Sequence, residues 1–136
     1  MANNDEIRWR QRLENLESAW KRLEAACEKS AYTELELAGL VQTFEFTFEL
    51  AWKTLKDLLF YEGYEVNSPR EAIRQGFANG LLTKGEEWLS LLESRNRLSH
   101  TYDQRAAEEA ARLIKQNYAP LVRDLVGELR RRRAKG

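Results

Sequence analysis

The sequence predicts an all-α protein, an antiparallel up-and-down bundle of four to five helices. Two observations point to this fold class. Apolar residues recur at spacings of three and four along most of the chain, and its seven glycines and two prolines fall mostly where helices should begin or end. The length of 136 residues suits one domain with a substantial core, and no repeat or flexible linker divides the chain. We therefore expect a single helical domain over residues 1–136.

The first predicted helix runs from about Asn4 to Lys29. Its apolar side chains step by four and three residues, which places them on one face of a helix. These side chains are Trp9, Leu13, Leu16, Trp20, Leu23 and Cys27.

The second predicted helix begins at a capping box and ends before Gly63. Thr33 is the cap of this box, and Glu36 follows three residues later. The segment 44–48 alternates apolar and polar residues as a strand would, but the helical spacing continues on both sides of it. In a helix, this segment turns Phe46 to a different face from the other two phenylalanines.

An apolar residue on a second face of a helix needs a second partner surface. Contact between two subunits is one way to cover such a face, so we expect the bundle to form a homodimer. Trp9 and Phe46 are the candidates for that contact. Ordinary core packing among several helices explains both residues nearly as well.

The third and fourth predicted helices are shorter. The segment 68–71 combines a serine cap, a proline in the first turn and a glutamate at the capping-box position, and this helix ends by Gly80. Thr83 with Glu86 opens the fourth helix.

The fifth predicted helix starts after Asp103 and contains Pro120. Proline removes one backbone donor, but the apolar stripe keeps its phase, so we expect a bend and not a break. A basic C-terminal tail follows at about residues 129–136. Residues 123–136 hold six basic and two acidic side chains, whereas the whole chain has 22 of each. The tail is suited to nucleic acid or to an acidic partner, although a solvated helix end explains it at least as well.

Cys27 is the single cysteine, which excludes an internal disulfide. The first residues lack the basic and apolar regions of a signal peptide, and no apolar run is long enough to span a bilayer. We therefore expect a cytoplasmic protein without a membrane partner.

The residue types also exclude several chemistries. One histidine and one cysteine cannot form a structural zinc site, and no glycine-rich phosphate loop occurs. Glu45 and Glu49 lie one turn apart and could hold a divalent ion, but a solvated flank is the favoured interpretation. The four aspartates lie far apart, so the pair that holds two magnesium ions in nucleotidyl transfer is missing. We expect no metal, no cofactor and no nucleotidyltransferase activity in this chain itself.

The remaining chemistry lies between Arg95 and Tyr102. Arg95 continues the apolar stripe of the fourth helix, where a guanidinium needs a partner. His100 is the single histidine, the residue type whose unperturbed pKa lies closest to neutrality, and an arginine matches the geometry of a phosphate. Such a group could act on a phosphodiester. Alternatively, Arg95 forms a salt bridge between helices, and His100 only helps to end the helix.

The segment 95–102 reads arginine, asparagine, three variable positions, histidine, one further position and tyrosine. This arrangement resembles the signature of HEPN-domain proteins. The resemblance extends over roughly residues 8–128, where the phenylalanine-rich block 44–56, the helix start at 68–72 and Trp88 are similar to the branch called nucleotidyltransferase substrate-binding proteins. The basic tail is not part of the match.

The resemblance implies the HEPN subunit of a two-component toxin–antitoxin system, a metal-independent endoribonuclease paired with a separately encoded minimal nucleotidyltransferase. Proteins of this type form homodimers that bring two motifs together. By this likeness, His100 is the general acid or base of RNA cleavage and Arg95 stabilises the phosphorane charge, while Asn96 orients either this pair or the phosphate. Tyr102 matches the tyrosine that the partner adenylylates, which would block the approach of RNA.

The alternative that the resemblance implies is a non-catalytic subunit that binds a substrate or nucleotide for a separate nucleotidyltransferase. The ribonuclease hypothesis requires Arg95 and His100 to be close together and open to a cleft. Arg95 in a core salt bridge, or a sequestered His100, would favour the binding subunit. A purely structural adaptor is the weakest interpretation.

Overall fold

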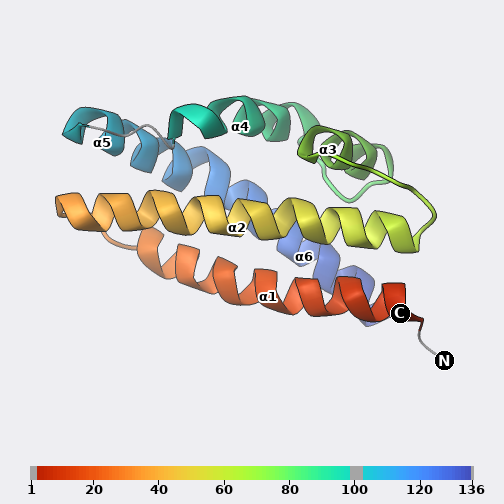
Figure 1. Ribbon diagram of the computed structural model, residues 1–136. Coiled ribbons are helices and arrows are strands. Elements are labelled where there is room, and N and C mark those ends of the chain that lie inside the picture. The colour runs from red at the N-terminus through yellow and green to blue at the C-terminus, as the bar shows by residue number, and fades with distance from the viewer. Residues whose placement is uncertain (1–2, 99–102, 136) are drawn as a thin grey trace.

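The computed structural model describes residues 3–98 and 103–135, which contain helices and no strand (Figure 1). The helices are α1 (Asn4–Cys27), α2 (Glu34–Tyr61), α3 (Pro69–Ala78), α4 (Gly85–Leu98), α5 (Gln104–Leu113) and α6 (Ala119–Lys135), with a π-helical turn, η1 (Ile114–Tyr118), between the last two. Because α5, η1 and α6 are continuous, the described residues form five helices, and the predicted all-α bundle is confirmed. No helix in these ranges combines the length and apolar character needed to cross a membrane.

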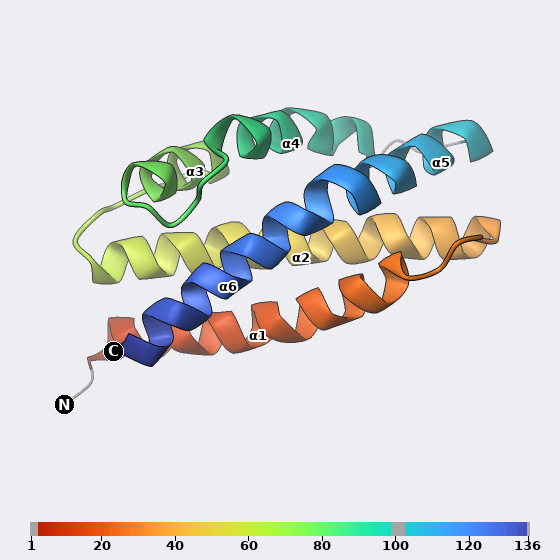
Figure 2. The ribbon, with the colours of Figure 1, turned by 180° about the vertical axis from the view of Figure 1, so that it is seen from behind.

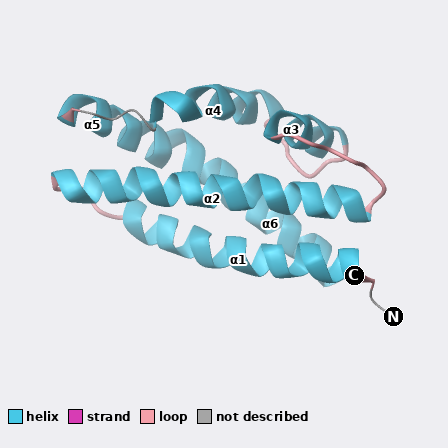
Figure 3. Ribbon diagram, viewed as in Figure 1, coloured by secondary structure: helices cyan, strands magenta, loops and turns pink. Residues whose placement is uncertain are grey.

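Helix α2 is the centre of the bundle. Helix α1 lies antiparallel beside it, and α3 and α4 follow one another along its other side (Figure 1). Helix α6 crosses α1 and α2 diagonally, on the face of the bundle that Figure 2 shows from behind. Short loops join neighbouring helices (Figure 3). This central position requires apolar side chains on several faces of α2, which its sequence supplies.

Two aromatic contacts join α2 to its neighbours. The Phe44 ring stacks on Tyr118 with the centroids 5.8 Å apart, and the Phe48 ring lies 6.4 Å from that of Trp88 in α4. All four residues are buried. Aromatic pairs at these separations stabilise a core beyond the area they bury. They fix α4 against α2 and so set the position of the residues that follow Trp88.

Three of the helix starts that were predicted from capping residues, at Thr33, Ser68 and Asp103, are confirmed. Thr33 Oγ1 accepts a hydrogen bond from the Glu36 backbone N–H (3.1 Å), and the Glu36 carboxylate accepts one from the Thr33 backbone (2.8 Å). Ser68 Oγ accepts from the Glu71 backbone N–H, and Asp103 caps α5 in the same way. Each cap satisfies a backbone donor that the first helical turn leaves without a partner.

Helix α4 begins at Gly85, two residues after the predicted start at Thr83. Its first intrahelical bond runs from the Trp88 N–H to the Lys84 carbonyl at 3.1 Å, so Thr83 lies outside the helix. The ring of Phe77 in α3 packs against this first turn, where a Cβ at Gly85 would lie 3.0 Å from it. The start of α4 is therefore set by packing between two helices and not by a local cap.

Helix α1 ends at Cys27, whereas the prediction extended it to Lys29. The Tyr32 hydroxyl donates a hydrogen bond to the Ala26 carbonyl at 2.6 Å. In a longer helix, this carbonyl would instead accept from a backbone N–H of the next turn. The loop therefore ends the helix.

The last helix was predicted to bend at Pro120 and not to break. The continuity of the helix is confirmed. Helical structure continues from Gln104 to Lys135, and the Ala119 N–H donates to the Ile114 carbonyl five residues back. This π-helical turn lies immediately before Pro120, which has no backbone donor of its own. The wider turn lets the helix continue through the proline.

Trp9 and Phe46 were the candidates for a contact with a second subunit, and for Trp9 the alternative of core packing is the one that the structure shows. Trp9 is 2% exposed and belongs to the core, because α2 and α6 both pack on α1 and cover that face. Phe46 is 55% exposed, so it projects from the bundle as expected.

Candidate functional site

Arg95 lies in the last turn of α4 and extends over α2. Its Nη1 donates to Glu49 Oε1 at 2.9 Å, and its guanidinium carbon lies 5.4 Å from the centroid of the Phe48 ring. A guanidinium over an aromatic face is attracted by the ring quadrupole. Because Phe48 is fixed in the core by Trp88, the ring is a rigid support that orients the arginine.

Arg95 forms the salt bridge between helices that was the alternative interpretation of this residue, and one of its partners is a carboxylate of α2. The pair lies at the surface and not in the core, since 30% of the Arg95 side chain and 43% of the Glu49 side chain are exposed. Ion pairs with this exposure contribute only about 0–1 kcal/mol. An incoming phosphate can therefore compete with Glu49 for the arginine.

A shallow groove of ≈ 270 Å³ adjoins this ion pair. It is lined by Gln42, Glu45, Phe46, Glu49 and Arg95. Glu45 Oε1 is buried and accepts no hydrogen bond from any described residue, which leaves a costly unsatisfied acceptor. The groove therefore offers a cation, an exposed aromatic ring and an acceptor that lacks a donor.

The other predicted site residues lie at the edge of the described structure. Asn96 follows Arg95 in α4, but its side chain lies outside the described part of the protein. His100 and Tyr102 fall between the two described ranges, which end at Leu98 and resume at Asp103. The proximity of His100 to Arg95 thus stays a prediction.

Glu49 was missed as a partner of Arg95, since the sequence favoured a solvated flank for Glu45 and Glu49, with a divalent-ion site as the alternative. Within residues 3–98 and 103–135, no group of three or more histidine, cysteine, aspartate or glutamate side chains could hold a metal ion. One signal could have pointed to Glu49 as a partner of Arg95. Glu49 directly follows Phe48, which packs against Trp88 of α4.

The basic end of the chain is helical, and its arginines have acidic partners. Glu17 accepts hydrogen bonds from Arg133 at 2.7 Å and Arg130 at 2.5 Å, so α6 is tied to α1. Arg132 pairs with Glu62 at the end of α2 and with Glu128 in its own helix. Hydrogen bonds from Arg133 and then Arg130 hold the pKa of the Glu17 carboxyl below its ordinary value, against the effect of burial.

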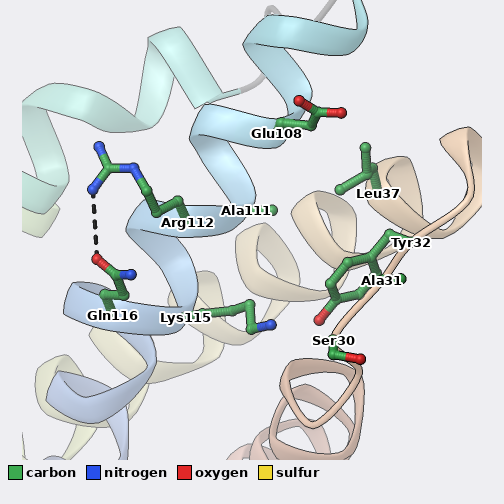
Figure 4. Close-up of a pocket in the computed structure, with 9 residues that line it drawn as sticks. All are labelled: Ser30, Ala31, Tyr32, Leu37, Glu108, Ala111, Arg112, Lys115 and Gln116. Carbon is green, nitrogen blue, oxygen red and sulfur yellow. Dashed lines mark hydrogen bonds between the residues drawn. The ribbon is translucent and has the colours of Figure 1, made fainter.

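A separate pocket of ≈ 460 Å³ lies where the loop between α1 and α2 meets α5 and η1 (Figure 4). Its Lys115 Nζ donates to the Lys29 carbonyl at 2.7 Å and lies 5.0 Å from the centroid of the Tyr32 ring. Arg112 pairs with Glu109 and points away from Tyr32 (Figure 4). Lys115 therefore ties η1 to the loop between α1 and α2, and Arg112 forms an ion pair within its own helix.

The fold and the groove define a class of protein. A five-helix bundle with a surface groove beside Arg95 fits the helical fold and the open arginine that the resemblance to HEPN-domain proteins implies. The chain belongs to the family described as nucleotidyltransferase substrate binding protein like, whose model matches residues 11–131.

Solved structures support this assignment. A crystal structure from Thermus thermophilus superposes with a TM-score of 0.77 at 31% sequence identity, over 85% of this chain and 98% of that one. A Haemophilus influenzae structure, described as revealing the fold of a substrate-binding domain of a nucleotidyltransferase, has a TM-score of 0.75 at 25% identity. That match covers 87% of this chain and 98% of the other.

A curated relative carries a more specific name. Over 76 residues the chain is 32% identical to the probable ribonuclease HepT of Haemophilus influenzae. The matched stretch covers 52% of this chain and 52% of that protein, so the chain spans about half the length of the curated relative that it matches.

Proposed function

We propose that this protein is the HEPN subunit of a two-component system, a metal-independent endoribonuclease that its partner nucleotidyltransferase neutralises. The main support for this proposal is the position of Arg95. It lies over the Phe48 ring at the surface and lines a groove. A cation fixed in this way stabilises negative charge that develops on a phosphate. The name of the Haemophilus relative supports the same activity.

The cleavage step needs proton transfer and charge stabilisation. The ribose 2′-oxygen bonds to phosphorus as its proton passes to a base, and the bond from phosphorus to the 5′-oxygen breaks as that oxygen takes a proton. His100 is the proposed acid or base, which contributes a factor of about 10²–10⁴ in rate. Arg95 stabilises the phosphorane, and Asn96 orients the phosphate.

A homodimer would supply two copies of these groups. Phe46 is exposed beside Arg95, and the buried Glu45 Oε1 lacks a donor there. A second copy of the chain that covers this groove would bury the ring and could donate to the carboxylate. Such an interface would bring two arginines and two histidines together around one RNA backbone.

Tyr102 is the proposed regulatory residue. The partner nucleotidyltransferase would transfer AMP from ATP to the phenol oxygen and release pyrophosphate. The added phosphate places negative charge close to Arg95 in sequence, where it would compete with RNA. Both components would act in the cytoplasm.

One observation favours a second function. The Glu49 carboxylate accepts a hydrogen bond from Arg95 Nη1. Such a pairing is expected if the arginine anchors a ligand or partner and performs no catalysis. The protein would then bind a substrate or nucleotide for the separately encoded nucleotidyltransferase. The Haemophilus structure is described as revealing the fold of a substrate-binding domain of a nucleotidyltransferase.

Cleavage of RNA by the purified protein without added metal separates the two functions. Wild-type protein should degrade RNA, and His100→Ala and Arg95→Ala should lose this activity, whereas Arg97→Ala should retain it. Arg97 is the matched control because it is exposed in the same turn and bonds to Ser94. Equal activity of wild type and His100→Ala would exclude the ribonuclease.

Adenylylation is tested separately by intact mass. With partner and ATP, wild-type protein should gain at least one adenylyl group, and Tyr102→Phe should gain none. An unchanged mass of the wild type would remove this part of the proposal.

A further inference from the structure

A pocket of ≈ 510 Å³ lies between α3 and the first turn of α4, on residues that the Arg95 groove does not use. Its floor is apolar, formed by the buried Ile73 and the partly buried Leu89. Its wall is Phe77, which is 53% exposed. Volumes between about 300 and 1,000 Å³ with mostly apolar walls are typical of small-molecule sites.

Phe77 is held in place despite this exposure. A Cβ at Gly85 would lie 3.0 Å from two atoms of the ring, so the absence of a side chain at this position allows the ring to pack against the backbone of α4. One side of the ring is therefore fixed, and more than half of the residue's surface is open to solvent. This arrangement forms a rigid aromatic platform.

The rim of the pocket carries four charged residues: Arg74, Lys84, Glu86 and Glu87. All four are exposed, and none of these side chains forms an ion pair or hydrogen bond with another described residue. Arginines 130–133, by contrast, all have acidic partners. The pocket thus combines two available cations with two available carboxylates around one aromatic ring.

We propose that this pocket binds a nucleoside monophosphate. The base stacks on Phe77, as bases do on exposed aromatic side chains. The phosphate lies between Arg74 and Lys84, which supply charged donors, and Arg74 lies one turn from Phe77 on the same face of α3. The ribose hydroxyls or an exocyclic amine donate to Glu86 and Glu87, as ribose hydroxyls do to carboxylates elsewhere.

The mixed charge of the rim determines the ligand class. The carboxylates repel a simple anion such as inorganic phosphate, and a neutral aromatic compound leaves the two cations without a partner. A nucleotide has an aromatic ring, hydroxyl donors and an anion in one molecule. This site shares no residue with the groove at Arg95, so its failure would leave the proposed ribonuclease intact. It rests on the second proposed function, nucleotide binding, for which it names a location and a ligand.

Isothermal titration calorimetry with AMP, adenosine and inorganic phosphate tests the assignment. Wild-type protein should bind AMP more tightly than either of the other two. Phe77→Ala should weaken AMP and adenosine by about tenfold, because the stacking is lost. Arg74→Gln and Lys84→Gln should each weaken AMP several-fold and leave adenosine unchanged.

Matched variants separate this site from a general loss of structure. Phe60→Ala removes an equally exposed phenylalanine and Arg70→Gln an exposed arginine of the same helix, and neither should change AMP affinity. Gly85→Ala displaces the Phe77 ring without changing charge, so it should weaken AMP while the thermal melting curve stays cooperative. Absence of AMP binding at millimolar concentration, or equal affinity of wild type and Phe77→Ala, would overturn the proposal. Loss of AMP binding in Arg95→Ala but not in Phe77→Ala would place AMP in the other groove and overturn it as well.

Discussion

Glu49 and Arg95 are 46 residues apart in the sequence, yet the Glu49 carboxylate accepts a 2.9 Å hydrogen bond from Arg95 Nη1. The two residues come from α2 and α4, and Phe48 supports the guanidinium from below. A phosphate that reaches Arg95 must displace this carboxylate. Glu49 is therefore a competitor of the proposed RNA substrate as well as a structural partner.

Removing this competitor should increase RNA affinity. We expect Glu49→Gln to bind RNA about two- to fivefold more tightly, since an exposed ion pair contributes up to about 1 kcal/mol. Fluorescence anisotropy in a His100→Ala background, where cleavage cannot interfere, measures the change. Glu93→Gln, which removes an exposed charge from α4 outside the groove, should leave affinity unchanged. Equal or weaker binding by Glu49→Gln would refute the competition.

The groove at Phe46 predicts the oligomeric state. If a second copy covers it, Phe46→Glu places a charge in the interface, and the mass measured by light scattering should fall from that of a dimer to that of a monomer. Leu35→Glu is the matched control, because Leu35 is exposed on the same helix but outside the groove. A monomeric wild type, or a dimer that survives Phe46→Glu, would show that this face is not the interface.

The ion pairs of Glu17 predict a dependence of stability on pH. The pKa of its carboxyl is lower in the folded protein because Arg133 and Arg130 hydrogen-bond the ionised form. Such a group stabilises the fold above its unfolded pKa of about 4.3, and this contribution is lost as the pH falls through the lower folded value. We expect Glu17→Gln to lower the free energy of unfolding by about 1 kcal/mol at neutral pH and by less in acid.

Urea denaturation of both proteins at neutral and acidic pH measures this difference. Glu28→Gln, at the exposed end of the same helix, should show neither the loss nor its pH dependence. A deficit of Glu17→Gln that stays constant down to low pH would contradict the assigned pairing.

The cap of α3 predicts a smaller effect. Ser68→Ala leaves the Glu71 backbone N–H without its side-chain acceptor, so the free energy of unfolding should fall by about 1 kcal/mol. Ser90→Ala, at an exposed position inside α4, is the control and should change stability little. A negligible difference between the two variants would mean that the cap does not contribute.

The sequence predicted the helices well where their ends depend on local chemistry. Thr33, Ser68 and Asp103 each satisfy a backbone N–H three residues later, an interaction that sequence spacing reveals. The start of α4 lies after its predicted position, because it depends on Phe77 packing against Gly85, which is a contact between helices.

The surface was harder to predict than the helices. Trp9 and Phe46 are both apolar residues of long helices, but only Trp9 lies where α2 and α6 cover α1. Which face is covered depends on the crossing of a helix more than a hundred residues later in the chain. Helical periodicity contains no information on that crossing.

The candidate site was predicted in part. The stripe of α4 placed Arg95 among apolar residues and required a partner for it, as the structure confirms. The identity of that partner, Glu49, follows from the packing of α4 on α2. Ion pairs between distant helices leave no spacing signal, and the same is true of Glu17 with Arg133.

The pairing of the arginines at the end of α6 has a consequence for salt dependence. Their charges are already balanced by Glu17, Glu62 and Glu128, so these arginines would neutralise few RNA phosphates and release few of the cations condensed on the RNA. RNA bound at the Arg95 groove alone would then displace about one ion for each arginine in contact with a phosphate. Its affinity should therefore change little between low and physiological ionic strength, unlike that of a protein that holds RNA along a basic tail.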